Sequence, residues 1–396
     1  MSRHKIVVTG MGIFTSLGKG VDANHASLQN NKGGITDISI LKTKHSGILP
    51  CGEIKYTNKE LQESTKFKAD SKIPRSVLIS IPPIAECLKM GGFTHEKQID
   101  FYYATTVGGI DISEDLLLEK SNGKEINHND FKYHDCGANT DLIADYFQLQ
   151  GNKFTISTAC SSAANAIGRA AESLKEGNCQ YALAGGSDAL CRFTLNGFNS
   201  LMILDKELCR PLDESRKGLN LGEGAAYLLL ETEENAISRG AEILGFVAGY
   251  SNTNDSHHQT ASSEEGTGAY LAITQAIENA GIAPSDISYI NAHGTGTLNN
   301  DLSEGNAIER VFENVPDIAS TKSFTGHTLA ASGAIEAVFS LLAILNQEVY
   351  PTLRYQEKIQ SHNFASFSLT KQKPVNYVLS NAFGFGGNCS ALIFSK

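Results

Sequence analysis

Cys160 lies at the junction of a predicted strand and a predicted helix, where a thiol can act as a nucleophile. Residues 154–157 are predicted to form a short buried strand, and from Ser161 to Leu174 apolar residues recur at helical spacing. The free N–H groups and the dipole at a helix start favour negative charge. They can lower the pKa of a thiol from about 8.5 to roughly 3.5–7.5. The position therefore predicts a thiolate nucleophile, and the alternative is a buried structural cysteine.

Two of the 11 histidines follow predicted strands in loops that contain glycine. His293 stands in Asn-Ala-His-Gly-Thr-Gly-Thr (291–297), and His327 stands in Thr-Gly-His-Thr (325–328), shortly after Lys322. A cysteine with two histidines from separate loops suits chemistry on a thioester. Thiolate attack on the carbonyl gives an acyl-enzyme, and N–H donors stabilise the oxyanion. Either histidine alone could instead be an ordinary core or surface residue, so this interpretation depends on the elements that position them.

The size and composition of the chain describe a globular protein with a large core. With 396 residues it exceeds the usual size of one domain, so two domains or one duplicated unit are expected. Hydrophobic residues at 41% and charged residues at 19% are ordinary for such a protein. The net charge of −10, with no long basic run, argues against nucleic acid as the main partner.

The cysteines and the apolar segments indicate the compartment. The 8 cysteines are scattered without a Cys-x-x-Cys pair, so neither a metal site nor a disulfide framework is expected, as in a reducing cytosol. The N-terminus lacks the apolar core of a signal peptide. The most apolar stretch, residues 334–345, contains Glu336 and is too short to span a bilayer. We expect a cytoplasmic protein that does not insert into membranes.

The same order of predicted elements occurs twice, in residues 1–240 and in residues 241–396. Each half runs strand, helix, strand, then a turn that leads into an apolar helix, and ends on a strand entered through glycines. The predicted strands lie at 5–9, 101–106, 154–157, 181–187 and 222–231 in the first half, and at 243–248, 287–291 and 385–394 in the second. Because the two apolar helices should meet near a pseudo-twofold axis, Cys160 should lie close to the turn that carries Lys322 and His327.

Two local features carry further expectations. Gly10 and Gly12 end the first strand and are similar to a dinucleotide loop, but Thr15 occupies the place of the third glycine. No acidic residue ends a second strand at the expected distance, so a Rossmann site is not expected. A helix is predicted over 71–90, and Pro82 and Pro83 should kink or break it.

Four motifs, found in order along the chain, resemble those of one enzyme family. They are Thr-Ala-Cys-Ser-Ser-Ala (158–163), Asn-Ala-His-Gly-Thr-Gly-Thr (291–297), Thr-Lys-Ser-Phe-Thr-Gly-His (321–327) and Asn-Ala-Phe-Gly-Phe-Gly-Gly-Asn (381–388). On these motifs the chain resembles the β-ketoacyl-[acyl-carrier-protein] synthases of the elongating, type II kind. The resemblance implies an α/β protein of the thiolase fold, with a duplicated five-layered αβαβα architecture, that works as a homodimer.

The resemblance also implies roles for the residues at matching positions. Cys160 would accept the acyl chain, and the backbone N–H groups of Cys160 and Phe385 would hold the acyl oxygen. His293 and His327 would promote decarboxylation of malonyl carrier protein and stabilise the enolate. Lys322, paired with Glu336, would orient the site electrostatically, and Thr295 and Thr297 would hydrogen-bond the phosphopantetheine arm. Phe385 would act as a gate, in a loop that Gly384, Gly386 and Gly387 allow to move. Val107 and Phe198 would line the acyl pocket.

Acyl carrier protein is the partner that the resemblance implies. No cofactor or metal is implied, because the substrates travel on the phosphopantetheine of the carrier. A basic group could dock the acidic carrier, with a solvated helix face as the alternative; it consists of Lys66, Lys68, Lys72 and Arg75. A heterodimer with a related ketosynthase-like subunit stays open beside the homodimer.

Several positions depart from the usual pattern of the family. Ser161, Ser162 and Ala163 stand where Ala-Thr-Gly often follows the nucleophile in housekeeping enzymes, and Lys-Gly-Leu-Asn-Leu-Gly (217–222) stands where Asp-Gly-Phe-Val-x-Gly is usual. These features look more like synthases of specialised polyene or polyketide pathways. They leave the chemistry intact and the substrate open.

The leading hypothesis is a decarboxylative Claisen condensation in fatty acid or polyene/polyketide-type chain elongation. One alternative is a non-catalytic chain-length-factor partner of another ketosynthase, but such subunits lack the nucleophile that Cys160 supplies. The other is a thiolase-type acyl-CoA enzyme, which would carry a second catalytic cysteine in a C-terminal glycine loop. Cys389 lies near that place but within a predicted strand.

Overall fold

The computed structural model describes residues 4–67, 72–93 and 98–396. In this part of the chain eleven strands form one large mixed sheet, in the order β4-β3-β5-β6-β1-β7-β13-β12-β8-β9 with β2 beside β1. The strands of this sheet are β1 (Ile6–Thr15), β2 (Gly18–Lys19), β3 (Asp100–Ala104), β4 (Lys153–Ile156), β5 (Tyr181–Asp188), β6 (Gly224–Thr232), β7 (Gly245–Asn254), β8 (Tyr289–Asn291), β9 (Asp317–Ala319), β12 (Tyr377–Phe383) and β13 (Asn388–Ser395). A separate pair consists of β10 (Glu348–Val349) and β11 (Lys371–Gln372).

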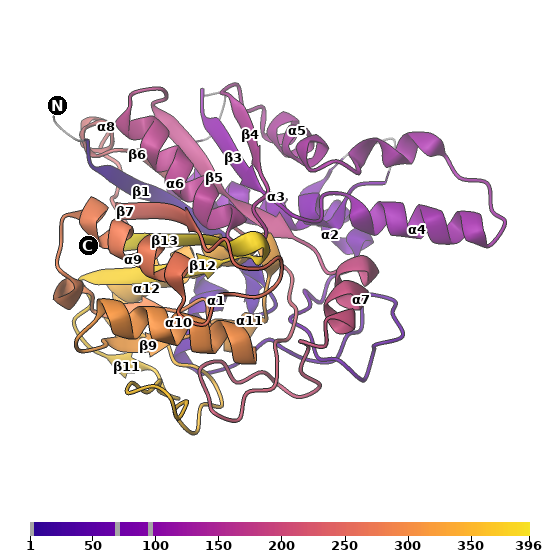
Figure 1. Cartoon of the computed structure of the whole chain (residues 1–396). Helices are drawn as coiled ribbons and strands as arrows, with labels where there is room; N and C mark the ends of the chain where they lie inside the picture. The colour runs from indigo at the N-terminus through magenta and orange to yellow at the C-terminus, as the bar shows by residue number, and fades with distance from the viewer. Residues whose placement is uncertain (1–3, 68–71, 94–97) are drawn as a thin grey trace.

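Helices cover both faces of this sheet (Figure 1). They are α1 (Val21–Gln29), α2 (Asn58–Thr65), α3 (Arg75–Met90), α4 (Ile110–Ser121), α5 (Cys136–Phe147), α6 (Ser162–Lys175), α7 (Arg192–Ser200), α8 (Glu233–Ser238), α9 (Thr267–Ala280), α10 (Leu298–Val311), α11 (Lys322–Thr325) and α12 (Ser332–Asn346).

The sheet consists of two halves with the same topology. Numbered within its own half, each set of five main strands has the order third, second, fourth, fifth, first. The halves join where β1 meets β7, through the residue pairs Val7–Phe246 and Val8–Gly245. α6 and α12 pack between the two half-sheets, α3 and α5 cover the outer face of the first, and α9 and α10 cover the outer face of the second. The predicted duplicated five-layered architecture of the thiolase fold is confirmed.

The two central helices cross in close contact, as the repeat predicted. A Cβ atom on Gly333 of α12 would lie 2.7 Å from the backbone nitrogen of Ala164 on α6, so only glycine permits this approach. In the described residues, one helical run, Leu329–Asn346, is long and apolar enough to cross a membrane, with mean hydropathy 1.7. Because 89% of it is buried inside the protein, it is the core helix of this fold.

The first strand continues through the glycines that were expected to end it. β1 runs to Thr15, and a Cβ atom on Gly10 or Gly12 would lie only 2.3 Å from Cys87 O or 1.9 Å from Pro83 O. These glycines therefore let α3 pack directly on the strand.

Of the kink or break predicted at the two prolines of α3, the break is wrong, and so is the predicted start of this helix. α3 begins at Arg75 and continues through Pro82 and Pro83 to Met90. Its apolar side packs along β1 and β6, and this tertiary packing holds the helix together although two N–H donors are missing.

The strand before Cys160 was predicted to be buried, and this is also wrong. β4 forms one end of the sheet, pairs only with β3 in the described structure, and leaves Phe154 41% exposed.

Candidate active site

Cys160 sits on a tight turn between β4 and α6, as predicted. Ala159 adopts a left-handed conformation with φ 54°, which is uncommon for a residue with a Cβ atom and occurs at strained functional turns. The hydroxyl of Ser162 donates to the carbonyl of Ala159 at 2.6 Å, and the N–H of Thr158 donates to Ser162 Oγ at 2.8 Å. These bonds fix the turn, so the thiol is held at the start of α6.

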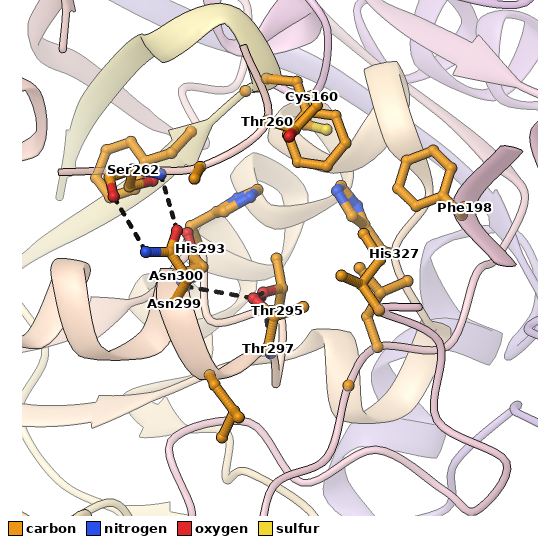
Figure 2. Close-up of a pocket in the computed structure, with 18 of the residues that line it drawn as sticks. Cys160, Phe198, Thr260, Ser262, His293, Thr295, Thr297, Asn299, Asn300 and His327 are labelled. Atoms are coloured by element: carbon orange, nitrogen blue, oxygen red, sulfur yellow. Dashed lines mark hydrogen bonds between the residues drawn. The ribbon is translucent and has the colours of Figure 1, made fainter. Parts of the chain in front are cut away.

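Both predicted histidines reach the same place from the other half of the molecule. His293 follows β8 and His327 follows α11, and their ring centroids lie 5.4 Å apart with the planes 84° to each other. Both side chains are buried, and Figure 2 shows the two rings pointing toward Cys160. The three residues line one cavity of about 330 Å³. The structure therefore brings Cys160, His293 and His327 together.

A buried ion pair stands behind His293. Lys322 Nζ donates to Glu336 Oε1 at 2.5 Å, to His293 O at 2.6 Å and to His293 Nδ1 at 3.2 Å. The ammonium group thus uses its three hydrogens within the protein. Because Nδ1 of His293 accepts one of them, a neutral imidazole carries its own proton on Nε2. Nε2–H is therefore the group that His293 can offer to a substrate.

Both histidines are neutral in this environment. Burial lowers the pKa of His293 and of His327 well below the usual value, and the positive charge of Lys322 lowers both further. His327 Nδ1 lies 3.0 Å from the hydroxyl of Ser332 at the start of α12. Neutral imidazoles held in this way can donate N–H to a developing negative charge or accept a proton.

The thiol is not the resting thiolate that its position predicts. Burial raises the pKa of Cys160 to about 12, although the charge of Lys322 and the N–H of Phe385 act in the opposite direction. Cys160 is 6% exposed, so loss of hydration outweighs the helix start. Its proton must leave as the thiol attacks.

This protonation state predicts how Cys160 reacts with an alkylating agent. A raised pKa keeps the thiolate a minor species at neutral pH, and its fraction grows with pH. The alkylation rate by iodoacetamide should therefore rise about tenfold for each pH unit from pH 7 to pH 9. Mass spectrometry of the peptide that contains Cys160 measures this rate. A rate that is already flat above pH 7 would show a lowered pKa and contradict the structure.

Most of the predicted substrate-binding residues line the same cavity. Thr295 and Thr297, whose hydroxyl oxygens lie 2.9 Å apart, stand on one side of it. Phe198, Phe385 and Gly386 also line it, and the rings of Phe198 and Phe385 stack with centroids 5.7 Å apart. Val107 does not line this cavity; it belongs to the buried apolar cluster against which Phe198 packs.

Two buried carboxylates that position the histidine loop were missed. On α10, Glu304 accepts the N–H groups of His293 and Gly294, each at 2.8 Å. Asp301 accepts the N–H groups of Gly296 at 3.1 Å and Leu212 at 2.7 Å. The sequence feature that could have revealed them is a pair of acidic residues three positions apart, early in the helix that follows the histidine loop.

One member of the predicted basic docking group, Arg75, is not on the surface. Arg75 is buried in an ion pair with Glu223, Nη2 to Oε1 at 2.7 Å, so the docking role predicted for it is wrong. Lys72 pairs with Glu119 at 3.3 Å. Lys68 lies outside the described residues, and Lys66 ends α2 at its C-cap.

Comparison with known proteins gives a consistent picture along the whole chain. Residues 3–236 match the "Beta-ketoacyl synthase, N-terminal domain" model, and residues 244–356 match the "Beta-ketoacyl synthase, C-terminal domain" model. The chain is 30% identical to a protein named 3-oxoacyl-[acyl-carrier-protein] synthase 2 from Staphylococcus aureus (strain COL), over 100% of this chain and 99% of that protein.

Solved structures are similar over the full length as well. "The ishigamide ketosynthase/chain length factor" gives a TM-score of 0.94 at 28% identity, with 100% of both chains covered. A type II polyketide ketosynthase solved in complex with its acyl-carrier protein (AntDE:AntF) gives a TM-score of 0.90 at 27% identity, again with 100% of both chains covered.

Proposed function

The chain belongs to the beta-ketoacyl synthase family, and we propose that it condenses an acyl group held on Cys160 with malonyl carried by acyl carrier protein. The products are 3-oxoacyl carrier protein, carbon dioxide and the free carrier that delivered the acyl group. The observation that carries this proposal is the single cavity into which Cys160, His293 and His327 converge. A condensing enzyme is an acyltransferase that needs a nucleophile and donors for a negative oxygen in one place.

In the first half-reaction Cys160 Sγ attacks the carbonyl carbon of the acyl thioester. The thiol proton passes to a neutral imidazole in the cavity, and the carrier leaves as its thiol once it regains a proton. Phe385 N–H points at the sulfur of Cys160, so it is placed to stabilise the oxygen of the tetrahedral intermediate together with the N–H of Cys160.

In the second half-reaction malonyl carrier protein loses carbon dioxide and forms an enolate. The N–H groups of His293 and His327 stabilise its oxygen, and Lys322 keeps His293 in the required tautomer. The enolate carbon then attacks the acyl carbonyl on Cys160 and expels the sulfur, which regains a proton. Thr295 and Thr297 are proposed to hydrogen-bond the phosphopantetheine arm. These steps use only the chain's own groups, so no cofactor is proposed.

The two alternative functions, a chain-length factor and a thiolase-type enzyme, have less support. A chain-length factor does not catalyse and lacks the nucleophile, whereas here Cys160 stands with both histidines. A thiolase-type enzyme would need a second catalytic cysteine, and Cys389 is buried in β13 outside the residues that line the cavity.

The decisive experiment offers the enzyme a panel of acyl carrier protein thioesters and weighs the acyl group trapped on Cys160. Transfer from saturated acyl chains of several lengths would indicate fatty acid elongation, and transfer restricted to unsaturated or polyketide chains would indicate a specialised pathway. Absence of any acyl adduct on Cys160 with every thioester would contradict the proposed function.

The open edge of β4 is proposed to pair with a second thiolase-fold chain. An edge strand with unpaired backbone groups and an exposed aromatic side chain is a ready site for pairing, and twofold symmetry lets the sheet continue into the partner. Phe154, which is 41% exposed, stacks on the buried ring of Tyr102 with ring centroids 4.5 Å apart, so its exposed ring lies on the outer side of this edge. A homodimer and a heterodimer with a related subunit both fit this edge.

Replacing Phe154 with aspartate should convert the dimer to a monomer. The buried charge would oppose pairing at the edge of β4, and light scattering measures the mass. Ile237→Asp is the matched control, because Ile237 on α8 is an equally apolar exposed residue away from β4. A Phe154→Asp protein that keeps its dimeric mass would contradict pairing through β4.

The carrier is proposed to dock at the mouth of the cavity. Met202 and Leu298 line this mouth and are 89% and 63% exposed. Lys217 lines it too, and Arg210 and Lys217 pair with the same carboxylate, Glu207, so this group of three side chains carries one net positive charge. An apolar centre with a basic rim suits an acidic carrier protein, which would insert its phosphopantetheine arm through this mouth. A cytoplasmic location, where such a carrier would be met, is proposed with it.

Reversing the charge of Arg210 and Lys217 together, by substitution with glutamate, should raise KM for the carrier-bound substrate about 10-fold with little change in kcat. Charges at the rim of the cavity affect how the carrier protein binds and not the chemical step, so KM changes and kcat does not. Steady-state kinetics at two salt concentrations measure it, and the effect should shrink at high salt. The control is Lys89→Glu, an exposed lysine on α3 that does not line the cavity. An equal rise in KM for the control variant would contradict docking of the carrier protein at this surface.

A further inference from the structure

A partly buried polar network joins the gate loop (residues 384–387) to the turn that carries the nucleophile (residues 158–161). Asn388 is the first residue of β13 and directly follows the gate loop. Its Oδ1 atom lies 2.6 Å from Ser161 Oγ and accepts hydrogen bonds from Asn165 Nδ2 at 2.9 Å and Asn252 Nδ2 at 2.8 Å. Asn388 Nδ2 in turn donates to Asn252 Oδ1 at 3.2 Å. One side chain thus connects α6, β7 and β13.

Asn165, in the first turn of α6, forms the second centre of the network and is 5% exposed. Its Oδ1 atom accepts from Tyr250 Oη at 2.9 Å, Asn252 Nδ2 at 3.0 Å and Ser390 Oγ at 2.5 Å. Its Nδ2 atom donates to Thr158 Oγ1 at 2.8 Å as well as to Asn388. Buried amides with this many partners are rigid, because each lost bond would leave a buried polar group unpaired.

The network reaches both sides of Cys160. Ser161 Oγ lies 2.6 Å from Thr158 O and 2.6 Å from Asn388 Oδ1, so its one hydrogen is shared between the turn and the loop. The gate loop is closed at its base by Gly384 N–H, which donates to Asn388 O at 2.8 Å. A Cβ atom on Gly384 would lie 2.9 Å from Thr158 O and 3.1 Å from Cys160 N. The loop and the turn are therefore in direct contact.

This contact matters because the two N–H groups at the thiol come from these two segments. Cys160 N–H belongs to the turn and Phe385 N–H belongs to the loop, and they are more than two hundred residues apart in the chain. An oxyanion hole stabilises a developing charge only when its donors hold the required separation. Nothing in the local sequence of either segment fixes that separation.

We propose that Ser161 and Asn388 are positioning residues that set the oxyanion hole by holding the gate loop against the nucleophile turn. The inference rests on the proposed function. It predicts a selective defect, because the network touches the Cys160 turn and the gate loop but neither His293 nor His327. Acyl transfer to Cys160 depends on this oxyanion hole, and decarboxylation of malonyl carrier protein depends on the histidines.

The test compares Ser161→Ala, Asn388→Ala, the double variant and Ser161→Thr with the full-length wild-type enzyme. Rapid quench with acyl carrier protein thioester gives the rate of Cys160 acylation, and carbon dioxide release from malonyl carrier protein gives the rate of decarboxylation. Ser173→Ala on the same helix is the matched control, since the side chain of Ser173 lies outside this network. Thermal unfolding reports whether each variant is folded.

Each single alanine variant should acylate at least about 10-fold more slowly and keep decarboxylation within about twofold of wild type. The double variant should be no slower than the slower single variant, because both remove the same contact. Ser161→Thr keeps the hydroxyl and should restore acylation. Equal losses in both half-reactions, multiplicative losses in the double variant, or unchanged acylation would each overturn the proposal. A wild-type enzyme that acquires no acyl group would instead contradict the proposed function, so the two failures are distinguishable.

Discussion

Replacing Cys160 with alanine is expected to abolish acyl transfer and condensation and to leave the fold intact. The side chain is small and buried in a turn held by bonds of Ser161 and Ser162, so its loss removes chemistry and little packing. Loss of a covalent nucleophile typically lowers turnover by at least about 10⁴-fold. Intact-protein mass spectrometry after incubation with acyl carrier protein thioester measures the adduct, and circular dichroism checks the fold.

A second cysteine serves as the control for this experiment. Cys179 is a free and partly buried thiol that does not line the cavity, so Cys179→Ala should acylate like wild type. An acyl adduct that forms on the Cys160→Ala protein at the wild-type rate would exclude Cys160 as the acceptor. Cleavage of the adduct by neutral hydroxylamine, which releases the acyl group as a hydroxamate and restores the thiol, confirms that the group is held as a thioester.

Alanine in place of His293 or His327 is expected to slow malonyl decarboxylation by about 10²-fold or more. Each substitution removes an N–H donor from the cavity where the enolate forms. The loss of both histidines should cost little beyond the larger single effect, since both act on one oxygen. Release of labelled carbon dioxide from malonyl carrier protein gives the rate directly, separate from condensation.

The histidine variants are cleaner tests than a change at Lys322. Removing the ammonium group would leave the buried carboxyl of Glu336 without its partner, so lost activity could reflect lost stability. His4→Ala is the control, because His4 is an exposed histidine near the N-terminus. Wild-type decarboxylation in the His293→Ala or the His327→Ala protein would refute the role of that histidine.

The site could be predicted from sequence because its parts belong to a repeat. The helix after Cys160 and the turn around His327 occupy equivalent places in the two halves, so the duplication itself implied that they meet. The prediction needed no knowledge of side-chain packing.

Features that depend on the surroundings of a residue could not be predicted in this way. The pKa of Cys160 is set by how much protein covers it, and the local pattern reports only the helix start. Pro82 and Pro83 are tolerated because α3 packs along β1 and β6. The exposure of residues 153–156 depends on whether a further strand or helix covers them, and the order of strands in the sheet decides this.

The pairing of β1 with β7, which joins the two half-sheets, also determines when the active site can form during synthesis. The nucleophile turn is complete once the first half has left the ribosome, but its apolar central helix α6 then lacks the cover that α12 provides. His293 and His327 arrive only with the later half, and the pairing of β1 with β7 that unites them is a contact between distant parts of the chain. Such contacts form slowly. The nascent chain must therefore pass through a stage in which the nucleophile is present without the two histidines and without the helix that later covers α6.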